Sequence, residues 1–183
     1  MTTKSAQQIY QELVQLREPY LDRAREASNF TLPHILPDEG TTGDTDLSRC
    51  YQSLGARGVT SLSSKMLQSL FPTSQPNFQL KLDIFAVQKL EAESGGETLV
   101  NELKSNLARI EQAVMNEFDS KGFRPMLHET LKQLVVAGNV LINLPKEGNM
   151  KVFKMDRYVV KRNHQGDPIL MVIKEQNPSQ PSS

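Results

Sequence analysis

Four long stretches of the chain carry apolar residues at a spacing of three or four positions, which lines one face of a helix. The first stretch predicts a helix over about Ala6–Ala27, begun by a capping box between Ser5 and Gln8 and kinked near Leu16–Glu18 because of Pro19. The apolar face of this helix is expected in the core and holds Ile9, Leu13, Leu16 and Tyr20. The opposite face is expected in solvent and holds Glu12, Arg17, Asp22, Arg23 and Arg25.

The second stretch, Asp46–Pro72, predicts a helix that is capped by its first residue and stopped by its last. Gly55, Gly58 and Ser61 lie three positions apart in it and therefore share one face. Two glycines inside a helix cost about 1–2 kcal/mol relative to alanine, and close approach of another helix would offset that cost. The alternatives are a break into two helices at the glycines and a phosphate-binding turn, although the glycine spacing fits no dinucleotide or P-loop fingerprint.

Two further helices are predicted in the second half of the chain. One runs from about Glu97 to Ser120, and the next begins near Pro125 and ends at Gly138. The first of them carries an apolar stripe that is typical of core packing. This stripe consists of Leu99, Leu103, Leu107, Ile110, Val114 and Phe118.

Strands are predicted where the period of the apolar residues changes to two. One half-buried strand is expected over Phe78–Ile84, followed by a short helix over Ala86–Ala92. After Gly138 two pairs of strands are expected: Val140–Leu144 with Lys151–Met155, and Tyr158–Arg162 with Ile169–Lys174. The last of these alternates poorly between apolar and polar residues, so we expect it to be covered on both sides.

Together these elements predict an α+β fold in which several long helices pack on a small, mainly antiparallel sheet. One domain is expected over residues 1–176, with a disordered tail over residues 177–183. Asn29–Asp46 is rich in Pro, Gly, Asp and Thr and predicts a flexible, irregular connector. Its acidic residues do not have the spacing of an EF-hand loop, so no calcium site is expected there.

The composition narrows the possible partners. The 183 residues carry 21 basic and 21 acidic side chains, a balance that gives no general attraction to nucleic acid or membrane. Apolar residues make up 38% of the chain, a thin core that also suits a surface built for an oligomeric neighbour. The single cysteine, Cys50, excludes an intramolecular disulfide and fits a reducing cytoplasm. No apolar run approaches the ~20 residues of a membrane helix, and the polar N-terminus predicts no signal peptide.

The sequence predicts no catalytic, cofactor-binding or metal-binding site. Its three histidines lie in three different elements without metal-ligand spacing: His34, His128 and His164. Several serines lie near Lys65, but none stands in a Ser-x-x-Lys register with it. No nucleophile elbow, P-loop or paired-carboxylate motif occurs either. We therefore expect a structural or interaction protein and not an enzyme.

Two blocks of sequence point to a family. The first is Leu54–Gly58, followed by Leu62, Ser64, Lys65 and Leu70–Pro72, and the second is Leu131–Leu141. Shorter matches extend the pattern in order over about Ile9–Glu175: Ile9–Tyr10, Pro19–Tyr20, Arg23–Ala24, Leu144–Pro145, Met150–Lys151, Tyr158–Val160 and Met171–Val172. The chain thereby resembles the portal proteins, or head-to-tail connectors, of short-tailed, podovirus-type phages.

The resemblance implies a virion protein in a dodecameric ring at one unique capsid vertex, assembled in the host cytoplasm. Double-stranded DNA passes through such a ring during packaging and ejection. Its implied partners are further copies of itself, the major capsid protein, terminase, a tail adaptor and internal core proteins, with no cofactor and no membrane. This chain resembles the N-terminal wing of such a subunit. The candidates for helix packing or subunit contact are Gly55, Arg57, Gly58, Ser61 and Lys65.

One departure from the family leaves two hypotheses open. The stem, clip and crown of the family would lie beyond Lys174, so we expect either a truncated copy or part of a longer subunit. The first hypothesis is a structural wing within a DNA-conducting ring. The second is a portal-derived interaction module that binds portal, capsid or a host factor without forming a channel.

Overall fold

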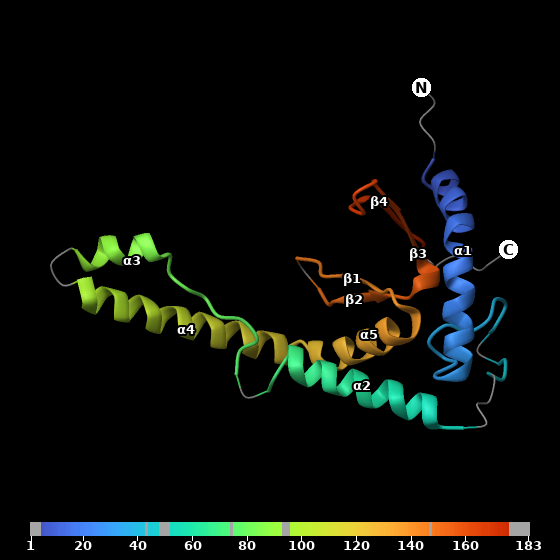
Figure 1. Cartoon of the computed structure of the whole chain (residues 1–183), viewed down its shortest axis with the longest axis horizontal. Coiled ribbons are helices and arrows are strands. Elements are labelled where there is room, and N and C mark those ends of the chain that lie inside the picture. Colours follow the sequence, from blue (N-terminus) through green and yellow to red (C-terminus); the bar gives the residue numbers. More distant parts are fainter. Residues whose placement is uncertain are drawn as a thin grey trace. The chain divides into compact units, whose positions relative to one another are not determined.

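The computed structural model describes residues 5–42, 44–47, 52–73, 75–92, 96–146 and 148–175. Within these residues the fold is α+β, as predicted, with five α-helices and two separate two-stranded antiparallel sheets (Figure 1). The chain divides into two compact units, Met1–Ser63 with Glu129–Ser183, and Ser64–His128. The predicted tail, residues 177–183, lies outside the described residues.

The helix α1 (Ala6–Phe30) starts as the sequence predicts and ends three residues later than expected. The Gln8 amide donates to Ser5 Oγ at 3.3 Å, and the Ser5 amide donates to Gln8 Oε1 at 3.0 Å, which completes the capping box. The helix continues through Pro19. A capping box satisfies two of the amides that a helix start leaves without partners, so this boundary is encoded locally.

The buried face of α1 is not the predicted one. Leu21, Ala24 and Ser28 are the buried side chains, whereas Leu16 and Tyr20 are 71% and 60% exposed. The expectation that Leu16 and Tyr20 lie in the core is therefore wrong within the described chain. The helix packs through a face that includes small residues, because other segments approach it closely there.

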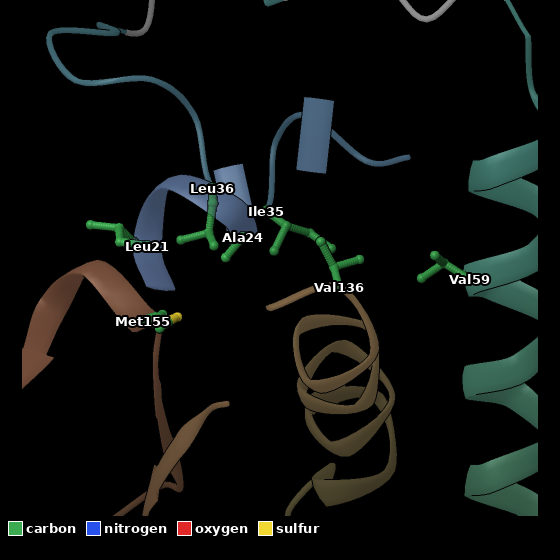
Figure 2. Close-up of a cluster of buried hydrophobic side chains, with 7 residues drawn as sticks. All are labelled: Leu21, Ala24, Ile35, Leu36, Val59, Val136 and Met155. Atoms are coloured by element: carbon green, nitrogen blue, oxygen red, sulfur yellow. The ribbon is translucent and has the colours of Figure 1, made fainter. Parts of the chain in front are cut away.

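The core of the first unit joins five segments (Figure 2). Its members are Leu21 and Ala24 of α1, Ile35 and Leu36 of the following loop, Val59 of α2, Val136 of α5 and Met155 of the 3-10 helix η1 (Met155–Arg157). The predicted connector is irregular, yet Ile35 and Leu36 are among the most buried residues. Ser28 anchors this loop: its Oγ accepts from the Leu36 amide at 3.1 Å and donates to the Leu32 carbonyl at 2.8 Å.

The helix α2 (Leu54–Leu70) begins later than predicted. Asp46 and Leu47 are not helical, so Asp46 is not the N-cap, and Cys50 lies outside the described residues. The helix runs without interruption through both glycines, which rules out a break at Gly55–Gly58. It ends just before Pro72, in agreement with the prediction.

The second unit contains α3 (Ile84–Glu91) and α4 (Gly96–Ser120), which pack against each other (Figure 1). The short helix is confirmed, but the strand predicted over Phe78–Ile84 is wrong, because the described residues before Ile84 are irregular. A strand needs a partner, and no described strand pairs with this segment. Instead the Leu80 amide donates to Glu111 Oε1 at 2.5 Å.

The bounds of α4 match the prediction closely, but its apolar stripe does not form a core. Leu99, Leu103, Ile110 and Val114 are 38–51% exposed. The expectation of core packing is therefore wrong for these four residues. Periodicity predicts which side chains share a face, and it does not predict whether the chain itself covers that face.

The helix α5 (Phe123–Ala137) is tied to its neighbours in the second unit by Arg124. The Arg124 guanidinium donates to the carbonyls of Phe71 at 2.5 Å and Pro72 at 3.1 Å, and to Asp119 Oδ1 at 2.7 Å. The Phe118 ring stacks on Phe71 and meets Phe123 edge-on, at centroid distances of 5.4 and 5.3 Å. The ends of α2 and α4 and the start of α5 are thus joined at one point.

Both predicted hairpins are present in the first unit. The strands β1 (Leu141–Asn143) and β2 (Lys151–Phe153) pair with Ile142 opposite Val152, and β3 (Tyr158–Arg162) and β4 (Pro168–Ile173) pair with Val160 opposite Met171. α5 stops where Gly138 adopts a φ of 71°, which favours glycine. The prediction that Ile169–Ile173 is covered on both sides is wrong: Ile169 is 63% and Met171 50% exposed.

Candidate protein-interaction surfaces

The predicted candidate residues of α2 lie on an exposed part of that helix. Arg57, Gly58, Ser61 and Lys65 are exposed, and Gly55 is half-buried. Neither Arg57 nor Lys65 forms a salt bridge with another residue that the structure describes. The core-facing residues of this helix are Val59 and Ser63, and Ser63 Oγ donates to the Val59 carbonyl at 2.7 Å.

The two glycines of α2 differ in their surroundings. A Cβ on Gly55 would lie 2.7 Å from the Phe30 carbonyl oxygen and 3.0 Å from Thr31 Cγ2, so Gly55 is where the end of α1 approaches α2 closely. A Cβ on Gly58 would meet no atom within 4 Å. Of these two glycines, Gly55 alone has a packing reason, among the described residues, to be glycine.

The second unit exposes an apolar surface, which we call the α3–α4 surface. It is formed by Ile84, Phe85, Leu99, Leu103, Ile110 and Val114. Ile84 and Phe85 are 70% and 79% exposed, although both open an amphipathic helix. Exposed large apolar side chains that gather on one face of a helix indicate a protein contact.

A second candidate surface is an open pocket in the first unit, which we call the α1–β3 groove. It has a volume of about 730 Å³ and is formed by α1, the end of α5, η1 and β3. Its lining includes Leu13, Leu16, Arg17, Tyr20, Arg23, Ala24, Val135–Asn139, Met155, Tyr158–Val160 and Arg162. Three of the four residues of α1 that the sequence placed in the core thus line this groove: Leu13, Leu16 and Tyr20.

Arg17 connects the two walls of the groove. Its Nη1 donates to the carbonyls of Met155 at 3.0 Å and Tyr158 at 2.7 Å, which orients η1 and the start of β3. From the same face of α1, the Tyr10 hydroxyl donates to the Asp156 carbonyl at 3.2 Å. The expectation that Arg17 lies on a solvated face is wrong, since it is half-buried and binds backbone carbonyls.

Tyr158 lies in the same lining and is only 4% exposed. Burial raises the pKa of its hydroxyl to about 12, although the positive charges of Arg17 and Arg162 oppose this shift. Its hydroxyl and Arg17 Nε are closed off from solvent and have no hydrogen-bond partner among the described residues. Tyr158 is therefore a neutral residue at physiological pH.

No described cluster of residues suggests a reaction. Ser64 Oγ and His128 Nε2 lie 3.1 Å apart, but no described carboxylate orients the imidazole. His34 and His164 lie elsewhere in the loops, and the part of the chain that the structure covers contains no group of three residues fit to hold a metal ion. No helix among the described residues is long and apolar enough to cross a membrane.

Sequence reasoning missed the α1–β3 groove because its residues come from segments that lie more than 100 positions apart, such as Arg17 and Tyr158. One signal was available: Leu13, Leu16 and Tyr20 form an apolar stripe beside Arg17 and Arg23. That combination fits a contact surface as well as it fits a core.

Comparisons with known proteins agree with one another. The family described as "Bacteriophage head to tail connecting protein" matches residues 3–179. The chain is 36% identical to the portal protein of Escherichia phage T7 over 176 residues, and 34% identical to that of Enterobacteria phage T3 over 175 residues. Each match covers 93% of this chain and 32% of the relative. A third, the portal protein of Enterobacteria phage SP6, is 32% identical over 160 residues. The chain thus spans about a third of the length of these relatives.

Proposed function

Because the chain belongs to the family of bacteriophage head-to-tail connecting proteins, we propose that it is a structural part of a phage portal ring, corresponding to the wing. In this role it works in the virion, at the vertex where DNA enters and leaves the capsid. Assembly takes place in the host cytoplasm, and the role requires no catalysis, cofactor or metal.

The observation that carries this proposal is the exposed α3–α4 surface. Leu99, Leu103, Ile110 and Val114 form a stripe along α4 that no described part of the chain covers. Complete burial of a fully exposed apolar side chain contributes about 1.5–3 kcal/mol, so each of these half-exposed side chains contributes about half of that. A stripe of four such residues is what a subunit needs for a stable contact with another chain or with a further part of its own subunit.

The exposed face of α2 is the second contact that we assign to assembly. Gly58 and Ser61 are small and exposed, which allows a neighbouring backbone to approach closely. Arg57 and Lys65 flank them on the same helix and supply charge for pairing with an adjacent subunit. Gly55 is not assigned to this contact, because it packs within the chain against the end of α1.

The partners follow from the proposed role. Further copies of the subunit form the dodecameric ring, and double-stranded DNA passes through it. The major capsid protein, terminase, the tail adaptor and internal core proteins contact the ring from outside or inside the capsid. A neutral chain suits this part of the ring, since the wing does not have to hold DNA by charge.

Electron microscopy of the purified chain over a range of concentrations tests this proposal. We expect rings with twelve-fold symmetry at high concentration. Monomers or dimers at every concentration would contradict ring formation by this chain. They would favour the alternative of an interaction module that binds portal, capsid or a host factor without a channel.

A further inference from the structure

The α1–β3 groove carries charge of one sign only. Its charged residues are Arg17, Arg23 and Arg162, and no Asp or Glu is among the described residues that line it. The chain as a whole is neutral, so this concentration of guanidinium groups is local. A concave surface with one sign of charge attracts and selects a partner of the opposite sign.

The three guanidinium groups are held in place but not neutralised. Arg23 Nε donates to the Pro19 carbonyl at 3.1 Å, and its guanidinium lies 5.0 Å from the centre of the Tyr20 ring. Arg162 Nη1 donates to the Gly166 carbonyl at 2.7 Å. Arg17 donates to two carbonyls, as described above, and none of the three pairs with a described carboxylate. Since a guanidinium has five N–H donors, each retains donors for an incoming acceptor.

Most of the remaining lining is apolar, and part of it is exposed. Leu13 and Leu16 of α1 face the groove together with Val136 of α5 and Val159 of β3, and Leu16 is 71% exposed. Val136 and Val159 are already buried, but further burial of Leu13 and Leu16 against other apolar groups is favourable, whereas a nucleic-acid backbone would gain nothing from them. The lining therefore favours a polypeptide over DNA.

We propose that the α1–β3 groove binds a segment of another polypeptide in which a carboxylate side chain lies between apolar side chains. The carboxylate pairs with the guanidinium groups of Arg23 and Arg162, for which a two-pronged pairing is the strongest geometry. The apolar side chains of the segment pack on Leu13 and Leu16. This contact lies in the first unit and is a separate claim from ring formation through the α3–α4 surface.

Selection from a random library of displayed nine-residue peptides, with the whole purified chain as bait, tests this proposal. Enriched peptides are then synthesised with a fluorescent label, and their Kd values are measured by fluorescence anisotropy. We expect enriched peptides to contain Asp or Glu beside Leu, Ile, Val or Phe. Replacing the peptide's Glu by Gln, or its Asp by Asn, should weaken binding about tenfold or more, because a hydrogen bond to a charged group is lost.

Arg23→Gln and Arg162→Gln provide the matching change on the protein, and both side chains are exposed enough to be replaced without loss of the fold. Each variant should weaken binding of the carboxylate peptide about tenfold. Neither should weaken binding of the peptide whose Glu or Asp is replaced by Gln or Asn, because that peptide has already lost the carboxylate. Arg109→Gln, on α4, serves as the control and should leave the Kd unchanged.

Three results would overturn the proposal. The first is a selection that enriches no peptide, or only peptides without a carboxylate. The second is equal affinity of the enriched peptides for the wild type and for both arginine variants. The third is binding of a duplex DNA oligonucleotide that depends on both arginines, which would assign the groove to nucleic acid instead.

Discussion

Arg17 Nη1 donates a 2.7 Å hydrogen bond to the Tyr158 carbonyl oxygen, and so joins the middle of α1 to the first residue of β3. The same nitrogen donates to the Met155 carbonyl. These contacts link residues 141 and 138 positions apart in the chain, and all three residues line the α1–β3 groove. One charged side chain thus organises both a packing contact and a candidate binding surface.

Replacing Arg17 by Met is expected to lower the free energy of unfolding by about 1.5–3 kcal/mol, because two carbonyls lose a charged donor. Arg109→Met, at an exposed position of α4, should change it by less than about 0.5 kcal/mol. Denaturant unfolding monitored by circular dichroism measures both values. Equal effects of the two substitutions would show that Arg17 does not stabilise the first unit.

The raised pKa of Tyr158 is expected to make the free energy of unfolding fall with rising pH above about pH 10. Its pKa is about 12 in the folded chain and about 10 in the unfolded one, so both states hold the proton below pH 10. Between about pH 10 and 12 the unfolded state loses its proton first, and the free energy of unfolding falls by at most about 1.4 kcal/mol for each unit of pKa difference. The free energy of unfolding of the wild type and of Tyr158→Phe, measured from about pH 10 to 12, shows the contribution of the Tyr158 hydroxyl. If the free energy of unfolding of the wild type falls no more steeply with pH than that of Tyr158→Phe, the prediction is contradicted.

Gly55 and Gly58 should respond in opposite ways to alanine. Gly55→Ala brings a Cβ to 2.7 Å from the Phe30 carbonyl and should destabilise the fold, since a backbone atom must move. Gly58→Ala meets open space and should stabilise α2 by about 0.5–1 kcal/mol through helix propensity. Thermal unfolding compares the two variants. A lower Tm for Gly58→Ala than for the wild type would show that Gly58 packs inside the fold after all.

Gly58→Leu separates folding from assembly. The folded chain should tolerate the larger side chain, because a Cβ at this position would have no described atom within 4 Å. Gly58→Leu is therefore expected to impair assembly and to leave folding intact. Size-exclusion chromatography and thermal unfolding of the same sample distinguish a folded, unassembled variant from an unfolded one.

Arg124 is expected to be more important to the second unit than the nearby Lys121. Arg124→Met removes the contacts with Phe71, Pro72 and Asp119 and should lower the free energy of unfolding by about 1.5–3 kcal/mol. Lys121→Met removes only an exposed pair with Glu117, which contributes about 0.3–0.5 kcal/mol. Hydrogen exchange in α4 and α5 reports the local effect. Unchanged exchange in Arg124→Met would refute this assignment.

Local signals in the sequence predicted elements well and surfaces poorly. The capping box of Ser5 and Gln8 and the glycine at position 138 are local signals, so the start of α1 and the end of α5 were predictable. The alternation over Phe78–Ile84 was misleading because a strand also needs a partner, and none is described. The apolar stripe of α4 correctly predicted an amphipathic helix. It did not reveal that much of the apolar face is exposed.

The candidate surfaces were predictable only in part, because local sequence signals do not show which distant segments come together. The residues of α2 were identified from one continuous block, and Gly58, Ser61 and Lys65 are indeed exposed. The α1–β3 groove combines α1 with β3, and the position of Tyr158 relative to Arg17 depends on the tertiary fold. Periodicity contains no information about such distant pairs.

The α3–α4 surface is the basis of the proposed assembly, and one pair of variants tests it most directly. Ile110→Lys places a charge in the middle of the exposed stripe, and Ser105→Lys places the same charge about 140° around the helix, at another exposed position. Sedimentation velocity, with electron microscopy of the same samples, measures the fraction of ring. We expect rings from the wild type and from Ser105→Lys, and monomers from Ile110→Lys. Rings from all three chains, or from none, would contradict the account.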